Sequence, residues 1–161
     1  MSFQSPFFAP TLQHATPQTA LGSYHIDELG KHYQYGQYSG THTAGRFSIL
    51  TQETFVFTPM TTALVGTPGT NWKNLGVACR SGTASYYGWF WIGFGEFECI
   101  IENAFAAADV VYTTANAGIP GTNSSSAVLD AFKSIDAGVT STRVTCMAAG
   151  RLTAGFVMAH D

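Results

Sequence analysis

Two groups of side chains have types and spacings that could carry out chemistry. The first is Glu96 and Glu98, which stand two residues apart in an extended stretch. Their carboxylates would share one strand face, near the separation that a retaining glycosidase requires. Such pairs usually come from different strands across a cleft, so we interpret these two as the exposed face of one strand. We therefore favour a small hydrolase less than the two binding functions described below.

The second group is His25 and His32, which lie near Asp27 and Glu28 in the sequence. Imidazole and carboxylate groups are common metal ligands. The spacing matches no His-Glu-x-x-His or zinc motif, and the chain has neither a Gly-x-Ser-x-Gly elbow nor a phosphate-binding loop. We therefore expect no metal, no cofactor and no enzymatic activity.

Three cysteines, Cys79, Cys99 and Cys146, are widely spaced and form no Cys-x-x-Cys motif. Each stands in an apolar or strand-like stretch, so we predict buried free thiols that act as small hydrophobic residues. Free thiols fit a chain that is made in a reducing cytoplasm.

Charged residues make up only 11% of the chain, whereas ordinary soluble domains have roughly 25%. Aromatic residues reach 14%, and protein interfaces are enriched in aromatics and depleted in charge. The composition therefore favours a protein that binds other protein surfaces. The seven Lys and Arg residues are scattered, no apolar run reaches 18 residues, and the first residues do not resemble a signal peptide. We expect neither a nucleic-acid partner nor a membrane partner.

The elements that position these side chains are predicted to be strands. Short segments rich in aromatic and β-branched residues alternate with frequent turns. The predicted strands cover 31–38, 46–50, 54–58, 74–79, 86–101, 110–114, 142–147 and 153–158. This pattern predicts an all-β domain, a small sandwich or barrel, over residues 23–161. Residues 127–135 are ambiguous, because their apolar side chains also fit a short helix.

The strongest predicted strand runs from 86 to 101 and is apolar on both faces in its first half. A strand of this kind lies in a core or has one face against a partner. We therefore predict Trp89, Phe90, Trp91 and Phe94 to be core or oligomer-contact aromatics, with a bulge, bend or close backbone approach at the nearby glycines. The alternative is a flat aromatic row that binds carbohydrate.

Residues 1–22 are predicted to form an extended N-terminal arm, because three prolines interrupt any periodic pattern. The arm also carries large apolar side chains, which we predict to be its anchors: Phe3, Phe7, Phe8 and Leu12. These anchors would dock on the protein's own domain, on a sister subunit or on another protein.

Four motifs occur in an order that resembles a family of small β-rich proteins of tailed bacteriophages, the capsid decoration or cement proteins. They are Gly30-Lys-His-Tyr-Gln-Tyr, Leu75-Gly-Val-Ala, Tyr87-Gly-Trp and Ala108-Asp-Val-Val-Tyr-Thr-Thr-Ala-Asn-Ala-Gly. The likeness covers roughly residues 30–120 and weakens beyond them. Ala108 departs from the family pattern, which usually has glycine there.

The resemblance implies a structural virion protein that binds the outer surface of the major capsid protein shell and stabilises the head. It also implies a homo-oligomer, expected to be a trimer, that is made in the host cytoplasm and located on the capsid exterior. In that family residues 127–135 are strand-like, so we favour a strand there. The alternative function is a virion-associated carbohydrate-binding or receptor-binding module.

Overall fold

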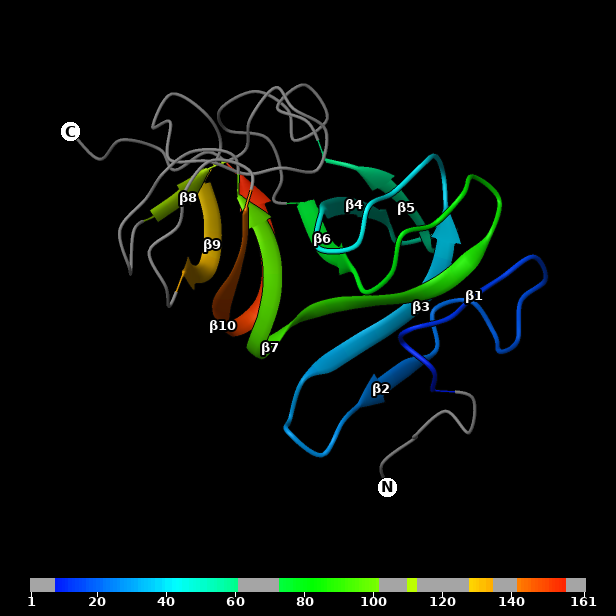
Figure 1. Cartoon of the computed structure of the whole chain (residues 1–161), viewed down its shortest axis with the longest axis horizontal. Coiled ribbons are helices and arrows are strands. Elements are labelled where there is room, and N and C mark those ends of the chain that lie inside the picture. The colour runs from blue at the N-terminus through cyan, green and yellow to red at the C-terminus, as the bar shows by residue number, and fades with distance from the viewer. Residues whose placement is uncertain (1–7, 61–72, 102–109, 113–127, 135–141, 156–161) are drawn as a thin grey trace.

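The computed structural model describes residues 8–60, 73–101, 110–112, 128–134 and 142–155. Within these ranges every regular element is a β-strand, which confirms the all-β prediction. The strands are β1 (Gln13–His14), β2 (Tyr24–Ile26), β3 (His32–Tyr38), β4 (Phe47–Thr51), β5 (Val56–Pro59), β6 (Lys73–Ala78), β7 (Tyr87–Ile101), β8 (Val110–Tyr112), β9 (Val128–Ser134) and β10 (Thr142–Gly155). Figure 1 shows β8, β9 and β10 on one side of the molecule, joined to the rest by the long strand β7.

Five consecutive strands close into a barrel. β3 pairs with β5, β5 with β4, β4 with β6, β6 with β7, and β7 returns to β3. The β3–β5 pair is parallel and the other four pairs are antiparallel. The barrel form of the predicted fold is therefore confirmed, with β1, β2, β8, β9 and β10 as additions to it.

All five barrel strands contribute to one buried cluster, which we place inside the barrel. Its members are Tyr38, Leu50, Phe57, Ala78, Phe90 and Ile92. The rings of Phe57 and Phe90 are stacked, with centroids 3.7 Å apart and planes within 7°. Gly76 leaves room for them, because a Cβ atom there would lie 2.6 Å from the Phe57 ring. The narrow interior is therefore filled by aromatic side chains that face a glycine.

A second, larger cluster lies on the opposite face of the same strands. On β7, Trp89 and Trp91 belong to this larger cluster, whereas Phe90 and Ile92 point into the barrel. The larger cluster also includes residues of β3, β4, β6 and β10, and Phe8 packs against it. Both faces of β7 are buried in this region, where Trp89, Phe90 and Trp91 are at most 1% exposed.

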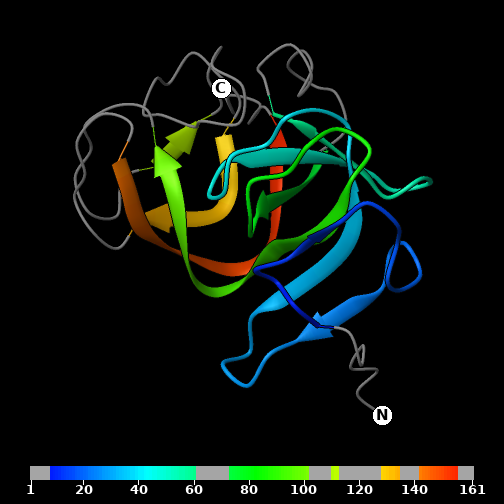
Figure 2. The same cartoon turned by 45° about the vertical axis from the view of Figure 1, so that its right-hand side comes forward.

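β7 pairs with different strands along its length because its backbone bends in the middle. Gly93, Phe94 and Gly95 all have positive φ angles, of 124°, 60° and 73°. A Cβ atom at position 93 would lie 2.1 Å from the Gly150 carbonyl oxygen, so only glycine fits there. Before the bend β7 pairs with β3, and after it β7 pairs with β10. Figure 2 shows this continuous strand curving from the barrel to the side of the C-terminal strands. The predicted bend and close approach are confirmed.

The C-terminal strands differ in detail from the sequence-based expectation. Residues 128–134 form the strand β9, so the strand interpretation of the ambiguous segment is correct. The two strands predicted on either side of Gly150 are one strand, β10, whose pairing with β7 shifts register between Ala148 and Arg151. A bulge in a continuous strand, rather than a turn between two strands, accounts for the glycine.

The described part of the N-terminal arm, residues 8–22, lies along the barrel. β1 pairs with the start of β7, a short pairing that the arm's sequence does not predict. The Arg80 guanidinium donates a hydrogen bond to the Thr11 carbonyl oxygen at 2.6 Å, and the Gln18 backbone N–H donates one to the Tyr35 hydroxyl at 3.1 Å. These contacts fix the course of the arm from Phe8 onward.

Candidate interaction surface

The turn between β2 and β3 is held by one carboxylate. Asp27 Oδ1 accepts hydrogen bonds from the backbone N–H groups of Leu29 and Lys31, both at 2.9 Å. Asp27 Oδ2 accepts a third from the Tyr33 hydroxyl at 3.1 Å. Gly30 completes the turn with a φ of 76°, a conformation that glycine adopts without steric cost. The turn is therefore anchored to a residue of the core.

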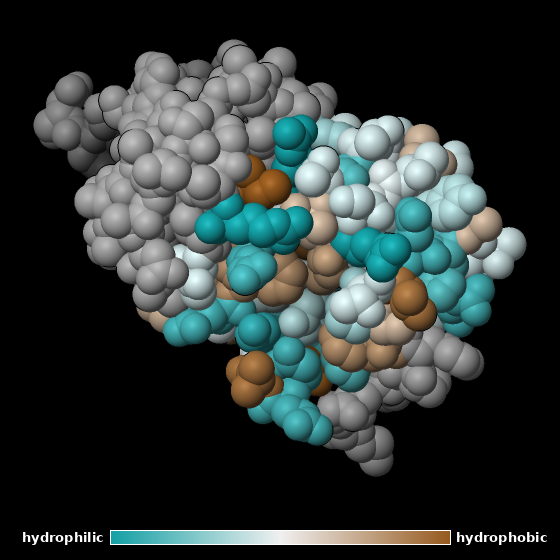
Figure 3. Space-filling model, viewed as in Figure 1, coloured by the Kyte–Doolittle hydropathy of each residue, from teal (hydrophilic) through white to brown (hydrophobic). Residues whose placement is uncertain are grey.

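This turn holds an apolar side chain in solvent. Leu29 is 76% exposed, the highest value among the large hydrophobic residues that the structure describes. In Figure 1 the β2–β3 hairpin projects from the barrel on the side where the chain begins. Figure 3 shows that hydrophobic residues on this face are separated by polar and neutral ones. The hydrogen-bonded turn therefore holds an isolated leucine in solvent.

A depression of about 450 Å³ lies beside the hairpin. Its lining combines two aromatic rings, two aliphatic side chains and two carboxylates, contributed by Phe8, His25, Ile26, Asp27, Glu28 and Leu29. Phe8, the first described residue, stacks on the His25 ring with centroids 3.7 Å apart. The arm therefore forms one wall of the groove and β2 with its turn forms the other; we call this the hairpin groove.

The histidines near the groove are neutral groups at pH 7. Burial lowers the pKa of both His25 and His32, and the Asp27 carboxylate only partly offsets this effect. His32 Nδ1 shares a hydrogen bond with the Tyr24 hydroxyl, and its ring stacks on Phe94 with centroids 3.9 Å apart. His25 Nδ1 is buried and has no hydrogen-bond partner among the described residues. The local charge therefore comes from the carboxylates.

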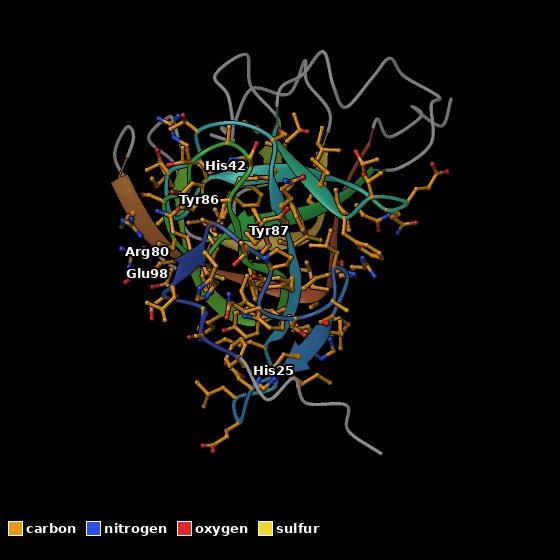
Figure 4. The ribbon with its side chains drawn as sticks, turned by 90° about the vertical axis from the view of Figure 1, so that its right-hand side faces the viewer. His25, His42, Arg80, Tyr86, Tyr87 and Glu98 are labelled. Carbon is orange, nitrogen blue, oxygen red and sulfur yellow. The ribbon has the colours of Figure 1, made fainter. Side chains whose placement is uncertain are left out.

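The arrangement of the histidines gives no support to a metal site. Figure 4 places His25 at one end of the molecule and His42 at the other. In the ranges that the structure describes, no three His, Cys, Asp or Glu side chains are grouped as metal ligands would be. Those ranges likewise contain no helix long and apolar enough to span a membrane.

His42 makes the folding stability dependent on pH. Its Nδ1–H donates a hydrogen bond to the Gly40 carbonyl oxygen at 2.9 Å, while Nε2 is buried without a partner in the described structure. Burial lowers the pKa of His42 below 6.5, and the hydrogen bond to Gly40 opposes this shift. The folded state therefore keeps the ring neutral at pH values where the unfolded chain takes up a proton.

We expect the free energy of unfolding to be constant above about pH 7 and to fall as the pH drops below 6.5, by at most about 1.4 kcal/mol per pH unit for each such histidine. Urea denaturation between pH 7.5 and 5.5 measures this slope. His42→Asn keeps a donor for Gly40 but cannot be protonated, so it should reduce the slope. Equal stability of the unsubstituted protein at pH 7.5 and 5.5 would contradict the assignment.

The remaining residues predicted as aromatic contacts or arm anchors differ in how deeply they are buried. Phe94 is half-buried at the bend of β7, where its carbonyl oxygen accepts a hydrogen bond from the Trp91 indole at 3.1 Å. Phe8 packs against the core of its own chain, between His25 and Trp89, whereas Leu12 is 49% exposed. Phe3 and Phe7 lie outside the described residues.

The burial of the tryptophans weakens the carbohydrate-binding alternative. Trp89 is 1% exposed and Trp91 is fully buried. A ring must offer a free face to stack on a sugar, and neither indole does. The large rings on β7 therefore contribute to the core and not to a sugar-binding platform.

The two carboxylates considered for hydrolysis lie on the outer face of β7. Glu96 and Glu98 are both exposed and lie opposite β10 residues, Met147 and Thr145. A Glu98 oxygen lies 3.9 Å from an Arg143 nitrogen, and both side chains are at least half exposed. This surface ion pair contributes little to stability. The structure therefore places Glu96 and Glu98 on an exposed strand face, as we inferred from the sequence.

All three cysteines are free thiols, as predicted, and Cys99 and Cys146 are buried in the larger cluster. Burial raises the pKa of Cys99 well above its usual range, and the adjacent Cys146 thiol adds to the effect. Cys79 is only partly buried, so the prediction of buried thiols holds for Cys99 and Cys146 alone. Burial of the Cys79 thiol still raises its pKa. Because the thiolate is the reactive form, Cys79 and Cys99 are weak nucleophiles at neutral pH.

We expect a thiol reagent such as 5,5′-dithiobis(2-nitrobenzoate) to modify almost none of the cysteines of the native protein at pH 7.5. In denaturant it should modify all three per chain. Absorbance at 412 nm counts the modified thiols. Rapid modification of Cys99 or Cys146 in the native state, located by mass spectrometry, would show that the larger cluster is open to solvent.

Sequence reasoning missed the role of the β2–β3 turn. Asp27 and Glu28 drew attention as possible metal ligands, whereas Asp27 caps the turn and Leu29 is its exposed tip. The signal was present in the order Asp27-Glu-Leu-Gly30, an Asp three residues before a Gly and just ahead of a strand. Asp side chains that bond to the backbone two residues later are typical of such turns.

Comparison of the sequence with models of protein families gives no match, and no curated protein is similar enough to be matched. The geometry described above, together with the sequence motifs, therefore carries the functional conclusion.

Proposed function

We propose that this chain is a structural virion protein: a capsid decoration protein that binds the outside of a shell of major capsid protein and stabilises the head. It acts as a homo-oligomer, expected to be a trimer, and catalyses no reaction. The observation that carries the proposal is the β2–β3 hairpin, whose hydrogen-bonded turn holds Leu29 in solvent, in a chain of which only 11% of the residues are charged.

Several features support this proposal. The four motifs that resemble decoration proteins occur in the family's order. A protein that coats a repeated surface needs exposed apolar contacts rather than a deep pocket, and Leu12, Tyr24, Leu29 and Tyr86 are such contacts. An oligomer also gains avidity, because several copies engage neighbouring capsid subunits at once. Each individual contact can then be weak.

Light scattering coupled to size exclusion, followed by co-sedimentation with undecorated shells, tests the proposal. A trimer that sediments with the shells and saturates at a fixed number of copies per capsid subunit is the expected result. A monomer that stays in the supernatant would overturn it. The same protein would then be screened against cell-surface glycans.

A further inference from the structure

β2 has one edge that no strand in the described ranges pairs with. The backbone groups of Ser23 and Asp27 face β3. The Asp27 N–H donates a hydrogen bond to the Lys31 carbonyl oxygen at 3.0 Å, and the Ser23 carbonyl oxygen accepts one from the Tyr35 N–H at 2.8 Å. Hydrogen bonds along an antiparallel strand alternate in direction. The backbone N–H and C=O groups of Tyr24 and Ile26 therefore point away from β3, and no other described strand pairs with β2.

An unpaired edge of this kind is a template for another extended chain. Natural proteins often protect such edges with lysine, proline or a covering segment. In the described structure Tyr24 and Ile26 have no such cover: Tyr24 is 38% exposed, and Ile26 lines the hairpin groove. The edge and the groove are therefore one continuous surface.

The charge of the groove indicates what it binds, whereas at the edge beside it the Arg151 guanidinium lies near Tyr24. The residues that line the groove include two acidic side chains, Asp27 and Glu28, and no basic one. His25 adds no positive charge, because burial keeps its ring neutral, and its Nδ1 atom lies buried without a partner. Apolar walls from Phe8 and Leu29 complete the groove. Such a lining fits the aliphatic stem and positive head of a lysine or arginine.

We propose that the free edge of β2 and the hairpin groove bind an extended segment of the major capsid protein that carries a basic side chain. The segment adds a strand to β2 through the backbone groups of Tyr24 and Ile26, and its basic side chain enters the groove toward Glu28. Addition of a strand gives affinity through main-chain bonds, while side-chain pockets give specificity. The capsid protein as the source of the segment rests on the proposed function.

Peptide titration of the full-length protein tests the edge itself. The probe is the capped pentapeptide acetyl-Val-Lys-Val-Arg-Val-amide, and the control is acetyl-Val-Glu-Val-Glu-Val-amide. With ¹⁵N-labelled protein, we expect the basic probe to shift the amide signals of residues 24–29 and to slow hydrogen exchange at Tyr24 and Ile26. The acidic control should leave them unchanged. Shifts outside this surface, or none at millimolar probe, would overturn the proposal.

Two substitutions at one position separate backbone pairing from side-chain contact. Ile26→Pro removes the outward N–H but leaves the bonds of His25 and Asp27 to β3, and proline is tolerated at such edge positions. Ile26→Ala keeps the N–H and removes the side chain. We expect Ile26→Pro to weaken probe binding about tenfold or more, and Ile26→Ala to weaken it much less. Equal losses in both would overturn the strand-addition mode.

Glu28→Lys tests the charge of the groove, because Glu28 is exposed and takes no part in the turn's hydrogen bonds. The substitution should lower the affinity for the basic probe about tenfold. Shell co-sedimentation with the same variants separates this proposal from the proposed function. Shells that bind all variants equally would refute the edge and leave decoration intact. Probe binding at β2 by a protein that ignores shells would refute decoration and the capsid protein as source.

Discussion

Replacing Phe90 with alanine is expected to lower the free energy of unfolding by about 3–5 kcal/mol. Phe90 is fully buried, stacks on Phe57 inside the barrel, and also contacts the Tyr38 ring at a centroid distance of 4.8 Å. Gly76 faces this space and has no side chain that could move to fill it. The cavity would therefore persist, and the loss should fall at the upper end of the range.

Urea denaturation followed by tryptophan fluorescence measures this effect. Leu12→Ala is the matched control, because Leu12 is half exposed on the arm and its loss should change stability by no more than about 0.5 kcal/mol. A cost below about 1 kcal/mol for Phe90→Ala would mean that the barrel interior collapses around the missing ring. It would contradict the packing described for β3 to β7.

Leu29→Asp is expected to have the largest effect on shell binding. The side chain is 76% exposed, so folding should be unaffected. The substitution removes the apolar contact and adds a carboxylate that must be desolvated at the interface, and attraction to a basic side chain in the groove offsets only part of this loss. A loss of about 1.4 kcal/mol per subunit is tenfold in affinity. If three linked subunits bind together, the combined loss reaches up to about a thousandfold.

Occupancy of shells over a range of protein concentrations measures this loss, and thermal melting establishes that the variant is folded. Met147→Asp is the control, because Met147 is also exposed, at 46%, but belongs to β10 and not to the hairpin. Wild-type occupancy for Leu29→Asp, or an equal loss for both variants, would exclude the hairpin as a specific contact.

The strands of the barrel were largely predictable because their signals are local. Alternation along β7 identified Trp89 and Phe90 as residues of opposite, buried faces, and the structure places them in two different clusters. The glycines that follow indicated the bend. Each of these features depends on side-chain period or on backbone conformation, which the sequence carries directly.

Closure of the barrel and the course of the arm were not predictable in the same way. The parallel pairing of β3 with β5 and the return of β7 to β3 join residues that are distant in the sequence. Phe8 and Leu12 look alike in the sequence, but only Phe8 reaches the core, because the arm's pairing at β1 and the Arg80 contact set its position. The strand pairing and the position of the arm are set by tertiary contacts, which no local sequence pattern reveals.

The bent strand β7 also has a consequence for how the molecule comes apart. It pairs with β3 and β6 before the bend and with β10 after it, so the barrel and the C-terminal strands depend on the same fifteen residues. β10 also pairs directly with β6, so the two parts should unfold in a single cooperative step. A shared strand leaves the molecule without a weak seam between its halves.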